Sequence, residues 1–104
     1  MWSYDLKPVQ AKLLDQGIID LSGNFDDDMA TYVRVALIHL AVAGSPKIEI
    51  RITSNGGGIT PGLDIYDMLI KYPGRTNGLV IGHAGSIATV VLQSCGHRWC
   101  LANS

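Results

Sequence analysis

Two glycine-rich segments constrain the fold of this chain more than any other feature of its sequence. Residues 54–58 (Ser-Asn-Gly-Gly-Gly) follow an alternation of polar residues and isoleucine, and residues 82–86 (Gly-His-Ala-Gly-Ser) follow a short apolar run. A helical pattern begins after each segment. A strand that passes through a tight turn into a helix is the repeating unit of a parallel α/β sheet. Because the carboxyl ends of parallel strands meet at one edge, we expect both turns to lie there, where ligands of such sheets bind.

Strands are predicted from the apolar periodicity. Residues 47–53 alternate strictly between polar residues and isoleucine, which predicts a strand with one packed face and one face at least partly in water. Residues 79–81 are apolar throughout, which is typical of a strand buried on both faces. In chain order, the predicted strands are residues 17–21, 47–53, 79–81 and 98–101.

Helices are predicted between these strands. Residues 29–42 carry apolar side chains around most of the helix surface, so protein is expected to cover both sides. The aspartates at residues 26–28 lie where carboxylates favour the positive end of the helix dipole and can cap free amides. The next helix is predicted to begin with Thr60 as N-cap and Pro61 as first helical residue, and the last to run over residues 86–95. The fold class is therefore α/β, with a mainly parallel sheet flanked by helices.

Composition excludes several classes of function. The 104 residues, 47% hydrophobic and 16% charged, indicate one compact domain or a large part of one. A net charge of −1 without long runs of like charge makes nucleic acid and membranes unexpected partners. No apolar run approaches the roughly 20 residues that span a bilayer, and the N-terminus lacks a signal-peptide layout. Cys95 and Cys100 match neither a zinc nor a redox spacing, so we expect both to be reduced core residues of a cytoplasmic protein.

Three ordered motifs give the chain a specific resemblance. Residues 53–67 (TSNGGGITPGLDIYD) are similar to the segment NSPGGSVTAGLAIYD, residues 82–88 (GHAGSIA) to GQAASMA, and residues 96–104 (GHRWCLANS) to GKRFALPNS. These segments belong to the proteolytic subunit of the ATP-dependent Clp protease, ClpP. The chain resembles this family over residues 14–104, so residues 1–13 are expected to be an N-terminal segment. Three motifs at near-family spacing are far more specific than one glycine cluster.

The resemblance implies a serine-type endopeptidase of the crotonase-like fold, incomplete at the C-terminus. Ser86 would be the nucleophile, and the backbone amides of Gly57 and Ile87 would form the oxyanion hole. A serine and amides at strand-to-helix turns suit these roles, because they can attack a carbonyl and stabilise the resulting negative oxygen. A peptide would bind as an added strand along the glycine turn, at Gly57, Gly58 and Ile59. No metal or organic cofactor is implied.

The resemblance also implies partners, namely peptide or unfolded protein as substrate, an oligomeric ring, and an AAA+ unfoldase that consumes ATP. The sequence departs from the family at Asn55, where proline is usual, and at Gly58, a third glycine that would loosen the turn. Glu49 and Arg51 stand where the family usually displays aromatic residues that help to dock the unfoldase, which puts that docking in question. The family's catalytic histidine and aspartate follow the segment matched by residues 96–104, so the isolated chain is expected to be inactive.

Other interpretations of the same residues stay open. Ser86 could be an ordinary helix N-cap, residues 56–58 a flexible turn, and His83 a base for the nearby serine. The chain could instead be a non-catalytic ClpP-like assembly module, which predicts oligomers without hydrolysis. It could also be a crotonase-like enzyme acting on acyl-thioesters, whose oxyanion hole needs no serine nucleophile. Replacing Ser86 with alanine separates this last interpretation from a serine peptidase.

Overall fold

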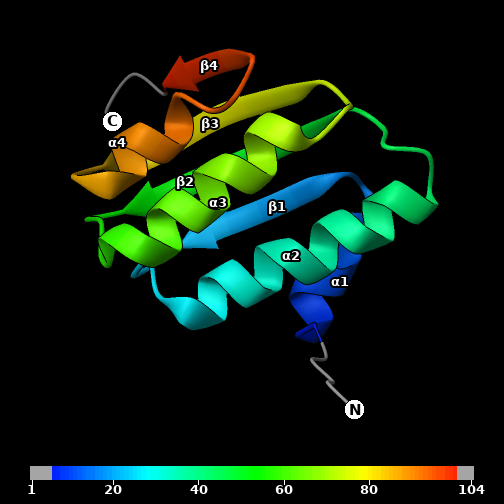
Figure 1. Ribbon diagram of the computed structural model, residues 1–104, viewed down its shortest axis with the longest axis horizontal. Helices are drawn as coiled ribbons and strands as arrows, with labels where there is room; N and C mark the ends of the chain where they lie inside the picture. The colour runs from blue at the N-terminus through cyan, green and yellow to red at the C-terminus, as the bar shows by residue number, and fades with distance from the viewer. Residues whose placement is uncertain (1–5, 101–104) are drawn as a thin grey trace.

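The computed structural model describes residues 6–100. Its strands form one parallel, four-stranded sheet in the order β1-β2-β3-β4 (Figure 1). This arrangement confirms the predicted α/β class with a parallel sheet flanked by helices. In chain order, the elements are α1 (Pro8–Asp15), β1 (Ile18–Ser22), α2 (Asp27–Val42), β2 (Ile48–Ser54), α3 (Ile59–Lys71), β3 (Thr76–Ala84), α4 (Ile87–Leu92) and β4 (His97–Cys100).

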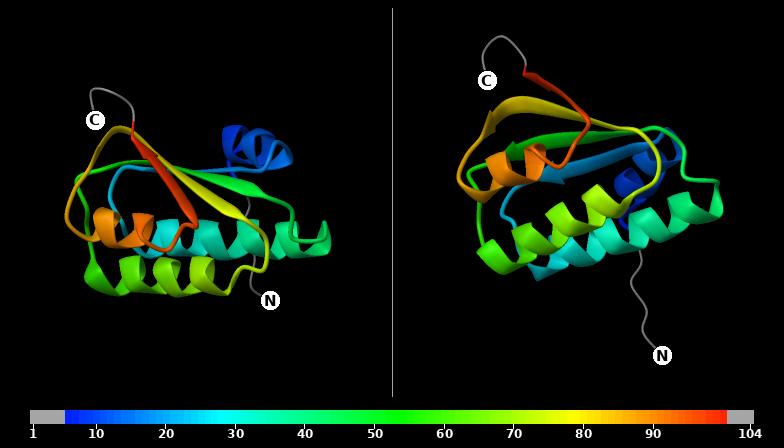
Figure 2. Two further views of the ribbon diagram at one scale, coloured as in Figure 1. Left: turned by 90° about the horizontal axis from the view of Figure 1, so that it is seen from above. Right: turned by 45° about the horizontal axis from the view of Figure 1, so that its top comes forward.

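The sheet has one covered face and one largely open face. Helices α2, α3 and α4 cover the first face, whereas α1 lies on the opposite face beside β1 (Figure 2). Alternate residues of β2 point into the core between the sheet and its helices, and Ile48, Ile50 and Ile52 are at most 1% exposed. The polar residues between them are half-buried on the other face. The period-two prediction for this strand is therefore confirmed.

Helix α2 has the predicted cap but not the predicted cover. The side chain of Asp26 accepts a hydrogen bond of 2.9 Å from the amide of Met29, as expected of an N-cap. The apolar residues Ile38 and Val42, near the carboxyl end of the helix, are 55% and 87% exposed. The prediction that protein covers both sides is therefore wrong here, because within the described residues this helix packs mainly on β1 and α3 and leaves its far side open.

Helix α3 begins earlier than its predicted cap at Thr60. Gly58 is the N-cap, with an extended backbone, and Ile59 is the first helical residue. Pro61 consequently lies inside the first turn of the helix. Its missing N–H has no cost there, because the first amides of a helix have no acceptor within the helix.

Strand β3 is longer than the apolar run that predicted it, and its burial alternates. Leu79 and Ile81 are only half-buried, on the face opposite the three helices. The prediction of burial on both faces is wrong, since the one described helix on that face, α1, lies beside β1 (Figure 2). Strand β4 begins one residue before the predicted start, and the predicted end at Leu101 lies outside the described residues.

The two cysteines occupy different environments. Strand β4 is at the edge of the sheet with its residues exposed, so Cys100 is exposed and the prediction of a core position is wrong for it. Cys95 is buried, as predicted, and this burial raises the pKa of its thiol. The Cys95 thiol therefore stays protonated and unreactive at neutral pH.

Candidate active site

The two glycine turns meet at the carboxyl edge of the sheet, as the parallel topology predicts. A Cβ placed on Gly56 would lie 2.7 Å from the Cβ of Ser86 and 3.4 Å from its hydroxyl oxygen. A hydrogen bond of 2.9 Å from the amide of Gly85 to the carbonyl of Ser54 ties the second turn to the end of β2. Ser86 can therefore hold its observed position only because Gly56 has no side chain.

An irregularity in β3 brings the second turn to this position. The pairing of β2 with β3 shifts after Ile52, so that Thr53 alone lies opposite residues 81–83. A bulge of this kind bends a strand and re-aims the residues that follow it. The hydroxyl of Thr53 donates a hydrogen bond to the carbonyl of Ile81 and so holds the bulge. Just beyond it, the chain turns at Ser86 into α4.

Ser86 is exposed and has an unusual backbone conformation for a residue with a side chain. Its φ of 52° and ψ of −127° resemble the first central residue of a type II′ turn, a position dominated by glycine. Ser86 stands at the N-cap position of α4, yet its side chain makes no capping hydrogen bond. An ordinary N-cap serine has an extended backbone and bonds an amide of the first turn. The N-cap interpretation therefore does not account for this geometry, which is of the strained kind that clusters at functional sites.

Gly57 lies where any side chain would collide with the neighbouring chain. Its φ is 148°, and an added Cβ would come within 2.5 Å of both the amide nitrogen and the carbonyl oxygen of Phe25. The amide of Phe25 donates to the carbonyl of Gly56 at 2.9 Å, and the amide of Gly58 donates to the carbonyl of Phe25 at 2.7 Å. These hydrogen bonds restrain the turn despite its third glycine.

The amides of Gly57 and Ile87 are the predicted oxyanion donors. No hydrogen bond between described residues uses either amide. Ile87 is the first residue of α4, and a helix has no acceptor for the amide at that position. Its side chain is buried against Gly62, where an added Cβ would lie 2.2 Å from it. Both amides thus lack an acceptor within the described residues, and their stabilisation of an oxyanion beside Ser86 stays a prediction.

The predicted peptide-binding residues Gly58 and Ile59 are both exposed. The amide of Gly58 is already bonded to Phe25, and its carbonyl accepts a hydrogen bond of 3.2 Å from the amide of Gly62. An added peptide strand would therefore pair with other backbone groups of the turn. Ile59, 67% exposed, opens α3 beside them. The role of these residues in substrate binding stays a prediction.

His83 is an exposed residue near the end of β3. No hydrogen bond between described residues joins it to Ser86, so the geometry gives no support to the alternative in which it is the base.

Residues 6–100 hold no group of three or more side chains that could bind a metal ion. None of the helices in that range has the length and apolar character needed to cross a membrane.

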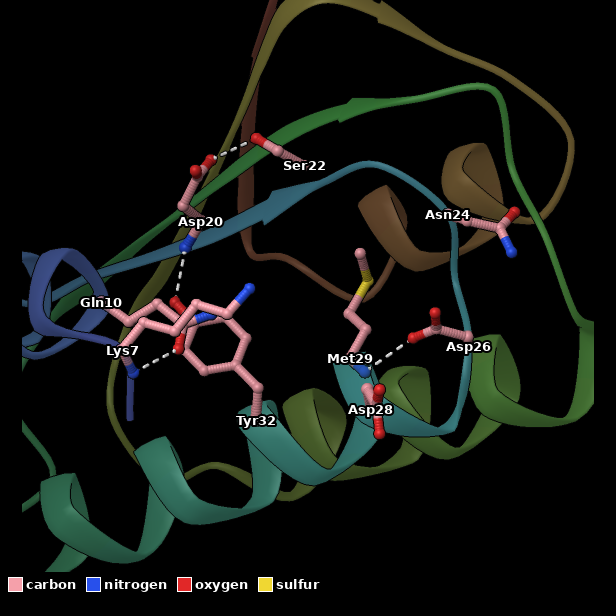
Figure 3. Close-up of a pocket in the computed structure, with 9 residues that line it drawn as sticks. All are labelled: Lys7, Gln10, Asp20, Ser22, Asn24, Asp26, Asp28, Met29 and Tyr32. Atoms are coloured by element: carbon pink, nitrogen blue, oxygen red, sulfur yellow. Dashed lines mark hydrogen bonds between the residues drawn. The ribbon is translucent and has the colours of Figure 1, made fainter. Parts of the chain in front are cut away.

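A pocket of about 420 Å³ lies between α1, β1 and the start of α2 (Figure 3). Several of its polar groups are bonded to one another: the hydroxyl of Tyr32 accepts from the amide of Asp20, and the hydroxyl of Ser22 donates to the Asp20 carboxylate, each at 2.9 Å. None of the predicted site residues lines this pocket. The candidate nucleophile lies instead on the open surface of the sheet edge.

Sequence reasoning missed one residue of this region, Ser54. It is only 2% exposed, and its hydroxyl accepts a hydrogen bond of 2.9 Å from the amide of Gly56. The available signal was a serine two residues before a glycine, a pattern that often forms a side-chain-to-backbone turn.

The fold is a parallel α/β sheet flanked by helices, and its candidate site is a serine that meets a glycine turn at the carboxyl edge of that sheet. A family model described as Clp protease matches residues 4–104. This chain therefore belongs to the Clp protease family.

Individual relatives agree with this assignment. The chain is 34% identical over 96 residues to the ATP-dependent Clp protease proteolytic subunit of Carsonella ruddii (strain PV), covering 90% of this chain and 50% of the relative. It is 37% identical over 107 residues to the protein of that name from Leuconostoc citreum (strain KM20), covering 98% and 51%. The solved structure of the ClpP1 N165D mutant from Listeria monocytogenes superimposes with a TM-score of 0.84 at 24% identity, over 91% of this chain and 57% of that one, which shows the same fold. The chain thus spans about half the length of the relatives it matches.

Proposed function

We propose that this chain provides the nucleophile and the oxyanion hole of a serine endopeptidase. The observation that carries the proposal is the exposed Ser86, held at a φ of 52° against the glycine turn. The amide of Gly57 in the first turn and that of Ile87, directly after the second turn, support it. So do the names of the two curated relatives, both proteolytic subunits of an ATP-dependent Clp protease.

In the proposed reaction, the hydroxyl oxygen of Ser86 attacks the carbonyl carbon of a peptide bond while a general base accepts its proton. The carbonyl oxygen becomes negative in the tetrahedral intermediate and accepts hydrogen bonds from the amides of Gly57 and Ile87. The intermediate collapses to an acyl-serine as the leaving amine takes the proton from the base, and water then hydrolyses the ester. We assign the base to polypeptide outside these 104 residues, either a continuation of the chain or a second polypeptide.

The proposed substrate is peptide or unfolded protein, and the proposed partner is an AAA+ unfoldase that docks on the open sheet face. On that face Leu79 and Ile81 are half-buried and Trp99 is 62% exposed, which supports docking of an apolar group. Arg51 and Glu49 form an ion pair of 2.5 Å on the same sheet, where aromatic residues would be usual for the family. The docking surface is therefore more polar than the family pattern. A cytoplasmic location is part of the same proposal.

Fluorophosphonate labelling of the full chain, detected by intact mass, tests the catalytic proposal. We expect label on Ser86 that Ser86→Ala abolishes, and much faster labelling after addition of the polypeptide that supplies the base, because a serine without a base loses several orders of magnitude in rate. Ser94→Ala is the matched control, since Ser94 is a buried serine whose hydroxyl donates to the carbonyl of Val91. Absence of label in both conditions contradicts the proposal. Thioester hydrolysis that survives Ser86→Ala would favour a crotonase-like enzyme instead.

A non-catalytic assembly module is the second candidate, and exposed apolar residues on α3 favour it. Ile59, Leu63 and Ile70 are 67%, 46% and 55% exposed, and with the half-buried Tyr66 they follow one side of the helix. Monomeric proteins rarely expose a continuous apolar stripe, so this side of α3 is expected to pack against another chain. Sedimentation of wild type and Leu63→Lys tests this. Oligomers that Leu63→Lys dissociates, without labelling of Ser86, would favour the assembly module over the peptidase.

A further inference from the structure

Ser54, the last residue of β2, lies beneath both glycine turns and is bonded to each of them. Its hydroxyl accepts a hydrogen bond of 2.9 Å from the amide of Gly56, in the turn that follows β2. Its backbone carbonyl accepts another of 2.9 Å from the amide of Gly85, in the turn that follows β3. Since Ser54 is 2% exposed, water does not compete for these hydrogen bonds. One buried residue therefore holds the first turn by its side chain and the second by its backbone.

Gly56 transmits this restraint to the candidate catalytic groups. Its φ of 117° is open to glycine, whose backbone would otherwise be free to move among several conformations. On one side, Gly56 is pressed against Ser86, where an added Cβ would lie 2.7 Å from the Cβ of the serine. On the other side, it is covalently joined to Gly57. Any displacement of Gly56 therefore changes the position of the Gly57 amide relative to the Ser86 hydroxyl.

We propose that Ser54 is a positioning residue of the oxyanion hole, whose hydroxyl fixes Gly56 and so sets the Gly57 amide in place beside Ser86. This inference rests on the proposed function, because it concerns the amide that would stabilise the oxyanion. Ser54 acts through Gly56 and is not itself a reacting group. Its carbonyl bond to Gly85 survives any side-chain substitution, so a change of the hydroxyl disturbs the first turn and leaves the second tied to β2.

Two substitutions separate the hydrogen bond from the volume of the side chain. Ser54→Ala removes the hydroxyl, which accepts from the amide of Gly56 and donates to its carbonyl at 3.2 Å, with little change in size. Ser54→Cys keeps a group of similar shape but replaces oxygen by sulfur, which is a weak acceptor. Thr76→Val is the matched control, because the buried hydroxyl of Thr76 also accepts from a glycine amide, that of Gly96 at 3.0 Å, but at the amino end of β3.

The measurement is the second-order rate of fluorophosphonate labelling of Ser86, on the full chain with the polypeptide that supplies the base, alongside the urea midpoint of each variant. We expect Ser54→Ala and Ser54→Cys to slow labelling by about tenfold or more, because small displacements of an oxyanion donor are costly. Thr76→Val is expected to lower the urea midpoint without slowing the labelling. Wild-type labelling rates in Ser54→Ala, or full rescue by Ser54→Cys, would overturn the positioning role.

Amide hydrogen exchange, followed by NMR on the chain alone, separates this inference from the proposed function. If wild type is never labelled, the proposed function fails, and exchange then decides whether Ser54 orders the turn. We expect Ser54→Ala to speed exchange at Gly56 by about tenfold or more and to move the amide resonance of Gly57, while Thr76→Val affects Gly96 instead. Unchanged exchange at Gly56 and an unmoved Gly57 resonance would overturn the inference.

Discussion

The turn after β2 and the turn after β3 both carry the chain from a strand into a helix, yet they place left-handed backbone on different kinds of residue. In the first turn, the positive φ angles of 117° and 148° fall on Gly56 and Gly57. In the second, positive φ falls on Gly82 and also on Ser86, which has a side chain. Glycine thus occupies the positions where the backbone approaches another segment closely, whereas in the second turn the strained φ falls on Ser86, the proposed nucleophile.

The two turns are also held differently. The first turn is fixed through Phe25 on one side and Ser54 on the other, by hydrogen bonds to Gly56 and Gly58. The second depends on one backbone hydrogen bond from Gly85, on the bulge of β3 and on the helix that follows. The first turn, which would supply the Gly57 amide, therefore has more hydrogen bonds from neighbouring segments than the second.

Gly57→Ala should remove the difference between the two turns with the largest effect on stability, because it gives the first turn a side chain at its tightest point. A Cβ there would lie 2.5 Å from two backbone atoms of Phe25, at a φ of 148°. We expect the free energy of unfolding, measured in urea, to fall by about 3 kcal/mol or more. Gly44→Ala is the control, since Gly44 has a φ of 93° but no atom within 4 Å of an added Cβ, and should lose only about 1 kcal/mol. Equal losses in the two variants would contradict the close approach.

Gly62→Ala disturbs the second turn through α3, the helix that follows the first turn. The new Cβ would lie 2.2 Å from the side chain of Ile87, whose amide is the other proposed donor. Overpacking costs about 1–3 kcal/mol, and the gain in helix propensity returns about 1 kcal/mol, so we expect a net loss of about 0–2 kcal/mol in the free energy of unfolding measured in urea. A gain in stability, as propensity alone would give, shows that Ile87 moves aside freely.

Ser86→Gly sharpens the comparison by giving the second turn the residue that the first turn uses. Glycine adopts a φ of 52° with a ψ of −127° without strain. The free energy of unfolding of Ser86→Gly should therefore exceed that of Ser86→Ala by about 1 kcal/mol. Both variants lack the hydroxyl and should be unlabelled, which makes alanine the matched control. A glycine variant no more stable than the alanine variant would mean that Ser86 carries no strain.

His83→Ala has the smallest expected effect. This exposed residue has no hydrogen bond to Ser86, so we expect less than about 0.5 kcal/mol of change in unfolding and an unchanged rate of serine labelling. A hundredfold slower labelling, with the fold intact by circular dichroism, would restore His83 as the general base.

Much of the fold could be predicted because its signals are local and periodic. The alternation around Ile50 specifies one buried face of β2, and the structure has that face against the helices. The apolar run around Val80 does not say whether one face or both will be covered, because that depends on which helices the topology brings to each side. The prediction of a buried Cys100 was wrong for the same reason, since nothing in its sequence neighbourhood shows that β4 is an edge strand. At α3, Thr60 has the residue type of an N-cap, but the helix begins two residues earlier, with the extended Gly58 as its N-cap.

The meeting of Ser86 with the glycine turn could also be predicted, because parallel strands place their carboxyl ends together whatever their detailed packing. The strained backbone of Ser86 could not be predicted from the sequence. It depends on the bulge in β3 and on the close approach of Gly56, and both are features of the folded chain. Ser54 was missed because its importance lies in its burial and in bonds to two turns that are distant in sequence. A serine beside glycines is too common to reveal that on its own.

The bulge in β3 has a consequence for how this chain tolerates changes in length. Residues 81–83 span a stretch that β2 crosses with Thr53 alone, so the number of residues between the last paired position and Ser86 determines where the serine arrives. One residue added or deleted there would carry the hydroxyl past Gly56, even with every motif residue intact. In this protein, the number of residues in the bulge therefore matters as much as their chemistry.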